Sequence, residues 1–513
     1  MRIRTFRFRR GAFTAAAFCL VFLPVAAAIA EAGGAARIFA SSNQSFAQGT
    51  VKAGANAIRE SRKVVYFNED LTDLVLGYAN FVVGPTGEQN GGQGDVRVKF
   101  SLEYQGTFFP FLTKGERLAP CADGATFATD PLPVSIKGGT YGAIRMWEQK
   151  ARPDPRTNHW LWSTEGDPAF NEGSVTHSDP DRDWTLGGAP GETAALAWTV
   201  DSSGMVTPKI TEAGSGITTS GVIIGLLDSQ RQGRGFGYIG TVKSGRLAGW
   251  FQHNGGAGYS QEVWIGPSGM GGYGGGGPVQ THGPCIVAGT PARPGKSVLL
   301  LGDSIGAGFG SSDKRGDIRR NFGIYARALS KKYNVCNAAI PGLTAYACDY
   351  RSARTRDLIH SILQPQVVLI GLGSNDIDQS VDDSRSKTPF EALRGHLASI
   401  ASWWTTHCSS EIWFATILPR VKLESRAEQP AAAQSIRPGF EAGGNADRIN
   451  TAMRDHLLFP ASTQIIDGRA LVQDPADPAQ WRTDQGALTD DGTHPSDGNG
   501  IPWIAARLRI PVP

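Results

Sequence analysis

Residues 296–305 read KSVLLLGDSI, an apolar run that ends in glycine, aspartate and serine. Further continuous apolar runs follow at Val335–Ile340, Val367–Gly373, Ile412–Leu418 and Thr463–Ile466. Unbroken apolar runs of this length are typical of strands that are buried on both faces. Helix-like stretches lie among them, at Asn321–Tyr333, Pro389–Thr406 and Asp447–Leu458. Buried strands that alternate with helices predict a doubly wound parallel sheet over residues 296–513.

Polar motifs follow directly after three of these strands. The first strand ends in Gly302-Asp303-Ser304, the second in Pro341-Gly342 and the third in Gly373-Ser374-Asn375-Asp376. A fourth motif, Asp491-Gly492-Thr493-His494, lies near the C-terminus. Ligands of open parallel sheets bind beyond the carboxyl ends of the strands, so we expect the first three motifs to meet in one cleft. A serine hydroxyl near a helix N-terminus, a glycine N–H and an asparagine amide would all face that cleft.

In this order, the four motifs resemble the sequence blocks of the SGNH (GDSL-type) hydrolase superfamily. The resemblance covers roughly Lys296–Pro513, and all four blocks are intact. One Gly-Asp-Ser triplet alone is a weak signal, whereas four blocks in the family's order are specific. The resemblance implies a flavodoxin-like α/β domain that hydrolyses carboxylic esters without a cofactor or a metal.

The resemblance also implies a role for each matching residue. Ser304 corresponds to the nucleophile, His494 to the general base, and Asp491 to the carboxylate that orients His494. The oxyanion hole corresponds to the backbone N–H groups of Ser304 and Gly342 together with the side-chain amide of Asn375. Acyl transfer requires such donors because negative charge develops on the carbonyl oxygen, and losing one donor commonly costs about 3 kcal/mol of barrier.

Three other carboxylates lie beside these residues and need separate interpretations. Asp303 and Asp376 fit the role of loop organisers, because aspartates at such turns commonly cap helices. Asp490 is the alternative partner of His494, but the Asp-x-x-His spacing of the family favours Asp491.

Residues 36–193 show a different pattern from the C-terminal half. Short runs alternate between apolar and polar residues and are separated by clusters of Gly, Pro, Asn and Asp. This period-two pattern predicts the antiparallel strands of a β-sandwich or jelly roll. The clearest candidates are Val64–Phe67, Leu74–Val83, Val96–Glu103 and Leu132–Lys137.

Residues 194–277 contain an internal repeat with an offset of 41 residues. Gly204-Met205-Val206 aligns with Gly245-Arg246-Leu247, and Val222-Ile223-Ile224-Gly225 aligns with Val263-Trp264-Ile265-Gly266. Each unit is expected to form strand, glycine-rich turn and strand. Residues 278–295 are expected to be a linker to the hydrolase domain.

The first thirty residues have the composition of a signal peptide. Met1–Arg10 contains five arginines and no acid, and the apolar run Gly11–Ala30 ends in small residues. This order predicts a leader over residues 1–30 and a secreted or periplasmic protein. Without the five arginines, 45 basic residues face 47 acidic ones. This balance argues against a nucleic-acid partner, and no later apolar run is long enough to span a bilayer.

Five cysteines remain after the leader: Cys121, Cys285, Cys336, Cys348 and Cys408. Export permits disulfides, and the spacing favours the pairs Cys336–Cys348 and Cys121–Cys285, with Cys408 buried and unpaired. Spacing alone leaves other pairings open. The sequence has no CxxC or HExxH motif, so we expect no zinc site.

Together these features predict an exported serine esterase that works through an acyl-serine intermediate. A β-sandwich before an SGNH domain is similar to the layout of bidomain carbohydrate esterases, which implies an O-acetylated extracellular polysaccharide as substrate. The alternatives are a lipase or arylesterase for lipid or small acyl esters, an O-acyltransferase, and a non-enzymatic surface-binding protein. The N-terminal half would then act either as an independent glycan-directing module or as a wall of the substrate site.

Overall fold

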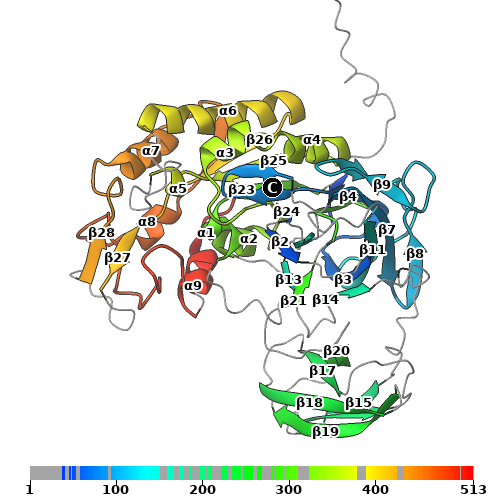
Figure 1. Cartoon of the computed structure of the whole chain (residues 1–513). Helices are drawn as coiled ribbons and strands as arrows, with labels where there is room; N and C mark the ends of the chain where they lie inside the picture. The colour runs from blue at the N-terminus through cyan, green and yellow to red at the C-terminus, as the bar shows by residue number, and fades with distance from the viewer. Residues whose placement is uncertain are drawn as a thin grey trace, which may run out of the picture. The chain divides into compact units, whose positions relative to one another are not determined.

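Five parallel strands form the sheet of the C-terminal half in the computed structural model (Figure 1). Their spatial order is β24 (Asn334–Asn337), β23 (Ser297–Gly302), β25 (Val367–Gly371), β26 (Glu411–Ala415) and β29 (Ser462–Ile466). Each predicted apolar run supplies one of these strands, so the predicted parallel sheet is confirmed. The strand order reverses at β23, which lies between β24 and β25, and open sheets of this kind bind ligands at that point.

The structure describes residues 37–40, 46–47, 49–52, 58–90, 94–150, 283–293, 295–309, 323–377, 389–424, 433–496 and 498–511. Between 159 and 281 it describes the strands together with residues 185, 202 and 205. The predicted leader over residues 1–30 lies outside the described residues. Ala36–Pro513 belongs to one compact unit.

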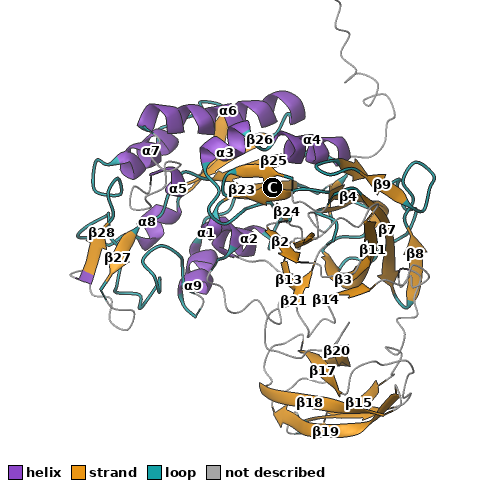
Figure 2. Cartoon of the chain, in the orientation of Figure 1, coloured by secondary structure: helices purple, strands orange, loops and turns teal. Residues whose placement is uncertain are grey.

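Helices cover both faces of the parallel sheet (Figure 2). Along β23, Val298 and Leu300 join one apolar cluster, whereas Leu299 and Leu301 join the other. The first cluster includes side chains of α2 (Gly323–Leu329) and α9 (Gly500–Arg507). The second includes side chains of α3 (Ala345–Tyr350), α4 (Ala353–Ile362), α6 (Phe390–Cys408) and α7 (Asn445–Arg454). Three short helices directly follow strands: α1 (Ser304–Ala307), α5 (Ser374–Ile377) and α8 (Gly468–Val472).

Two antiparallel sheets form the N-terminal sandwich. One contains β1 (Ile38–Phe39), β22 (Ile286–Pro291), β4 (Leu71–Ala79) and β10 (Thr126–Ala128). The other contains β14 (Gly173–His177), β3 (Ile58–Phe67), β11 (Thr140–Lys150), β7 (Val96–Tyr104) and β8 (Thr107–Pro110), with β9 (Ala119–Cys121) on β7. Side chains of both sheets meet in a single apolar cluster. The predicted β-sandwich class is therefore confirmed for the N-terminal region.

Strand β4 buries both of its faces. Leu74, Leu76 and Tyr78 enter the cluster inside the sandwich. Val75 and Ala79, on the opposite face, enter the cluster that fills one side of the parallel sheet. This division follows the period-two alternation of a strand. The sandwich and the C-terminal half therefore share a core.

The predicted linker over residues 278–295 is largely strand. Residues 286–291 form β22, which pairs with both β4 and β1. Residues 279–281 form β21 (Val279–Thr281), which pairs with β13 (Thr164–Gly166). Val287 enters the cluster inside the sandwich, whereas Ile286 and Ala288 enter the cluster beside the parallel sheet. The run is therefore buried on both faces, and it pairs with strands far earlier in the chain.

The predicted strand over Leu132–Lys137 is wrong. This segment makes only isolated bridges to β4, through Leu132 and Ile136. Pro131 and Pro133 flank Leu132 and lack the N–H groups that a continuous ladder requires.

Neither predicted disulfide is present, because the five cysteines from Cys121 to Cys408 are free and buried. The thiol of Cys121 donates to the carbonyl of Ala125, and that of Cys285 donates to the carbonyl of Gly77. Burial raises the pKa of each of these two thiols to about 12. Cys408 is buried and unpaired, as expected.

The repeat region holds strands at the predicted offset. Strands β15 (Leu196–Val200), β16 (Val206–Ile210) and β17 (Gly221–Asp228) are matched 41 residues later by β18 (Arg234–Lys243), β19 (Arg246–Ala257) and β20 (Val263–Ser268). Strands β15 and β16 pair with each other, and the remaining four form a sheet in the order β19-β18-β17-β20. The glycine-rich turn expected between β16 and β17 lies outside the described residues.

Three small antiparallel pairs complete the described strands. They are β2 (Gly49–Lys52) with β12 (His159–Trp162), β5 (Val82–Gly84) with β6 (Gly87–Gln89), and β27 (Val421–Leu423) with β28 (Gln434–Ile436). The β5–β6 hairpin follows β4 directly in the chain.

The shared core predicts that the sandwich and the C-terminal half unfold together. Ile362 of α4 is 4% exposed, and its side chain packs directly over Gly77 of β4. Truncation by Ile362→Ala should lower the free energy of unfolding by about 2–5 kcal/mol. Calorimetry should show a single transition for the sandwich and the C-terminal half, shifted to lower temperature. The control Leu457→Ala, at a site that is 59% exposed, should leave the transition temperature unchanged. Separate transitions, with only one shifted, would contradict the shared core.

Candidate active site

Ser304 is the first residue of helix α1, directly after strand β23. Asp303 is the N-cap of this helix, and its carboxylate accepts a hydrogen bond from the backbone N–H of Ile305 at 2.9 Å. The turn is tight because Gly302 and Gly306 both lie against Ala339. The short strand-to-helix turn leaves Ser304 half-buried at the carboxyl end of the sheet.

Three of the predicted site residues meet in one hydrogen-bonded chain. The Oγ of Ser304 lies 2.8 Å from Nε2 of His494. Nδ1 of the same imidazole lies 2.6 Å from Oδ2 of Asp491. The other carboxylate oxygen of Asp491 accepts the backbone N–H groups of Thr493 and His494, each at 2.8 Å. His494, from the last motif, therefore reaches Ser304 across 190 residues of chain, and Asp491 follows through the imidazole.

The turn that carries His494 is held in place by the protein interior. Gly492 has φ of 78°, and a Cβ there would collide with the carbonyl of Val421. Its own carbonyl accepts hydrogen bonds from the backbone N–H of Val421 at 2.9 Å and from the buried indole of Trp481 at 3.1 Å. Only glycine fits this position without strain. The anchored turn fixes the direction in which His494 points.

Gly342 and Asn375 lie on two neighbouring loops. Gly342 has φ of 79°, which favours glycine. The amide nitrogen of Asn375 donates to the carbonyl of Leu343 at 3.2 Å. Asp376 ties the same loops together, because its carboxylate accepts the backbone N–H groups of Ala345 and Tyr346. The amide of Asn375 therefore lies beside the backbone that carries Gly342.

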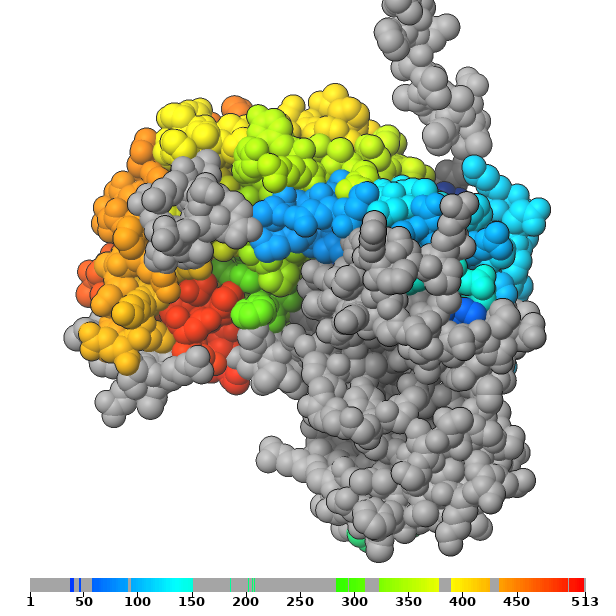
Figure 3. Space-filling view, in the orientation of Figure 1, coloured from blue at the N-terminus to red at the C-terminus, as the bar shows by residue number. Residues whose placement is uncertain are grey.

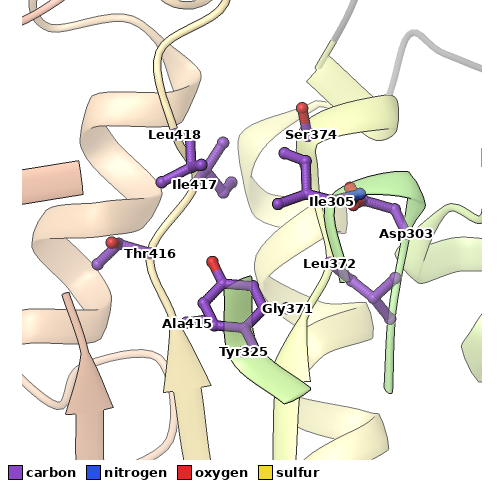
Figure 4. A pocket seen from close by; sticks show the side chains of 10 residues that line it. All are labelled: Asp303, Ile305, Tyr325, Gly371, Leu372, Ser374, Ala415, Thr416, Ile417 and Leu418. Atoms are coloured by element: carbon purple, nitrogen blue, oxygen red, sulfur yellow. Dashed lines mark hydrogen bonds between the residues drawn. The ribbon is translucent and has the colours of Figure 1, made fainter. Parts of the chain in front are cut away.

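The carboxyl group of Asp303 is fully buried beneath the site. Burial raises its pKa to about 6, although the hydrogen bond from Ile305 and the nearby His494 act in the opposite direction. Figure 4 shows Asp303 at the edge of a small cavity between α1, α2 and the ends of β25 and β26. Burial likewise raises the pKa of Asp376. Both carboxylates hold backbone N–H groups, which agrees with the predicted role of loop organisers.

Asp491 differs from these two carboxylates. Burial acts to raise its pKa, but the hydrogen bonds from the side chain and backbone of His494 lower it well below the usual range. The group is therefore ionised at neutral pH and faces the imidazole as a carboxylate. None of the hydrogen bonds described for His494 involves Asp490.

Two side chains near the site were not found by sequence reasoning. Phe309 packs its ring 5.0 Å from the ring of His494 and is 52% exposed. Arg420 donates to the side-chain oxygen of Asn375 at 3.4 Å, which orients the amide so that its nitrogen faces Leu343. Neither residue belongs to one of the four motifs. The only sequence feature that could have indicated them is their position, because Phe309 lies shortly after α1 and Arg420 shortly after β26.

The described residues contain no group of three His, Cys, Asp or Glu side chains placed to hold a metal ion. Within those same ranges, no helix is long and apolar enough to cross a bilayer.

Comparison with known proteins identifies the domain that carries this geometry. Residues 300–498 match the model of the GDSL-like lipase/acylhydrolase family. Among curated proteins, none matches the chain. A crystal structure of the psychrotrophic esterase EstA from Pseudoalteromonas sp. aligns with 41% of this chain and 93% of its own, at 16% identity and a TM-score of 0.28. The acetylxylan esterase Axe2 from Geobacillus stearothermophilus aligns with 41% of this chain and 91% of its own, at 19% identity and a TM-score of 0.28.

The family match covers all of the chain between the first and the last of the four motifs. Residues 300–498 are therefore a GDSL-like lipase/acylhydrolase domain, and this part of the protein is a carboxylic ester hydrolase of the SGNH type.

Proposed function

We propose that the protein hydrolyses oxygen esters through an acyl intermediate on Ser304. The observation that carries the proposal is the continuous chain from Ser304 Oγ to His494 Nε2 and from His494 Nδ1 to Asp491. A serine hydroxyl is a weak nucleophile, and a base within hydrogen-bond reach is the usual way to activate it. The carboxylate keeps the imidazole in the tautomer whose Nε2 can accept the proton.

The reaction then runs in two halves. In the first, Oγ of Ser304 attacks the carbonyl carbon while His494 takes the hydroxyl proton, and the same proton passes to the departing alkoxide, which leaves as an alcohol. In the second, water attacks the acyl-serine, His494 takes a proton from that water, and the proton returns to Oγ as the carboxylic acid leaves. Asp491 stabilises the charged imidazole in both halves.

The oxyanion formed in each half needs fixed donors. We assign this role to the backbone N–H groups of Ser304 and Gly342 and to the side-chain amide of Asn375. Two features support the assignment. The Asn375 nitrogen already faces the loop of Gly342, and Arg420 holds the amide oxygen on the other side. A donor held in advance needs no reorganisation when the charge develops.

For the substrate, we propose an O-acetyl ester on an extracellular polysaccharide. Exposed aromatic rings support this class: Phe309 lies on His494, and Tyr346 and Tyr350 project from α3, which begins three residues after Gly342. Tyrosine and phenylalanine faces bury area at small entropic cost, and the phenolic tips can hydrogen-bond to hydroxyl groups. The leader-like composition of residues 1–30 supports action outside the cytoplasm, in the periplasm or the medium.

The first test removes the nucleophile. Ser304→Ala should abolish hydrolysis of p-nitrophenyl acetate while the circular-dichroism spectrum stays native, because the acyl-serine cannot form. Ser330→Ala, at the end of α2, is the matched control and should keep full activity.

On graded p-nitrophenyl esters and acetylated xylan, the wild type should prefer acetate and release acetic acid from the polymer. A preference for long acyl chains would favour a lipase instead.

The second test distinguishes two neighbouring carboxylates. Asp491→Asn should lower kcat, because the amide would no longer stabilise the charged imidazole. Asp490→Asn should leave kcat within about twofold, since exposed substitutions away from the chemistry have small effects. If Asp490→Asn proves the more harmful change, Asp491 is not the orienting carboxylate.

The third test concerns the oxyanion hole. Asn375→Ala should lower kcat by about 10²-fold or more with little change in KM, since its donor matters most in the transition state. Steady-state kinetics on the acetate ester measure both constants. An alanine variant with undiminished kcat would show that Asn375 only shapes the turn.

A further inference from the structure

The β5–β6 hairpin of the N-terminal half reaches the proposed oxyanion loop. Its turn holds Pro85 and Thr86, and a Cβ placed on Gly342 would lie 3.0 Å from Cγ and 3.2 Å from Cβ of Pro85. The proline ring therefore packs directly on the backbone of Gly342. The rest of the ring is exposed, so Pro85 forms part of the surface beside this donor.

The same hairpin also caps helix α4. Ser352, the N-cap residue, makes no side-chain hydrogen bond to the helix. Instead, the carboxylate of Glu88 accepts the backbone N–H of Thr355 at 2.6 Å and that of Arg354 at 3.1 Å. It also pairs with the guanidinium of Arg354 at 3.0 Å, with only 6% of the glutamate side chain exposed. A carboxylate at a helix N-terminus satisfies free donors and complements the helix dipole.

Between these two contacts lies the segment that carries α3. The backbone N–H of Glu88 donates to the carbonyl of Arg351 at 2.8 Å. Gly87 has φ of 93°, and a side chain there would collide with Arg351. Residues 342–355 are thus held at the start by Pro85 and at the end by Gly87 and Glu88. Figure 3 shows sandwich residues, in blue, against residues of the C-terminal half, in yellow-green.

We propose that the β5–β6 hairpin is a positioning element of the active site, and that it holds the N–H of Gly342 where the oxyanion forms. The inference rests on the proposed function, because it needs Gly342 to be an oxyanion donor. Pro85 and Glu88 act as positioning residues: Pro85 limits movement of the glycine, and Glu88 fixes the hairpin to α4. Misplacing a catalytic donor by about 1 Å can cost on the order of 10²-fold in rate. The N-terminal half is then a working part of the catalytic site.

The test uses point variants of the full-length chain. Pro85→Ala and Glu88→Ala should each lower kcat for p-nitrophenyl acetate by roughly 10-fold, with KM within about twofold. The inhibition constant of ethylboronic acid should rise by the same factor, because its tetrahedral adduct on Ser304 uses the same donors. Glu88→Gln keeps an acceptor for the helix N–H groups and should recover part of the lost kcat.

Glu103→Gln is the matched control. Glu103 accepts hydrogen bonds from Arg62 and Arg145 within the sandwich, at 2.9 Å and 2.7 Å. Its loss should lower the melting temperature without changing kcat or boronate inhibition. If Pro85→Ala and Glu88→Ala behave like Glu103→Gln, with lower stability and full kcat, the hairpin is only structural and the inference is wrong.

Hydrogen exchange provides a readout that does not depend on esterase activity. The amides of residues 342–350 should exchange faster in Pro85→Ala and Glu88→Ala than in the wild type, and unchanged exchange would also overturn the inference. Failure of the proposed function looks different. In that case the wild type would not hydrolyse the ester, or Ser304→Ala would match it, whatever the hairpin variants do.

Discussion

The two-sided burial of strand β4 is the constraint on which the rest of the structure depends. Successive side chains of a strand point to opposite faces, so β4, in which residues 74–79 are all buried, must be covered on both faces. Leu74 and Leu76 are covered by the second sheet of the sandwich, and Val75 and Ala79 by the core of the hydrolase domain. Both halves of the chain are therefore fixed against the same strand. The β5–β6 hairpin leaves β4 directly, so the same burial directs Pro85 toward Gly342.

The hydrolase fold could be predicted because its signals are local. Each buried parallel strand is a continuous apolar run, and the polar motif that follows the strand lies within a few residues of it. Residues 286–291 were expected to be part of a linker but form strand β22. A short apolar run after a glycine-rich stretch has no local feature that indicates which distant strand it pairs with. The strand prediction failed at Leu132–Lys137, where the apolar alternation was right but two prolines limited the ladder to bridges. The disulfide pairs failed because spacing does not measure distance, and each thiol lies in its own buried environment.

The residues of the candidate site also fall into two groups, those predicted from local motifs and those placed by tertiary packing. Asp491 and His494 are three residues apart, so one turn brings the carboxylate to the imidazole. Phe309, Arg420 and Pro85 come from other segments, and no motif links them to Ser304. Their places are set by tertiary packing: Arg420 is oriented toward Asn375, and Pro85 is delivered by a hairpin that α4 anchors through Glu88. Local sequence thus predicted the reacting groups, whereas the groups that hold them became visible only in three dimensions.

The path of the chain through the sandwich makes the glycine-rich repeat an insertion. Strands β3, β4, β7, β11 and β14 precede the repeat, and β22 follows it. Strand β13, shortly before β14 in the chain, pairs with β21, which lies between the repeat and β22. The two ends of the insertion are therefore held side by side by the sandwich itself. Because closing a longer loop between fixed ends costs little additional entropy, copies of the 41-residue unit could be gained or lost in evolution without disturbing the register of β22. We therefore expect related chains to carry different numbers of repeats before the same catalytic half.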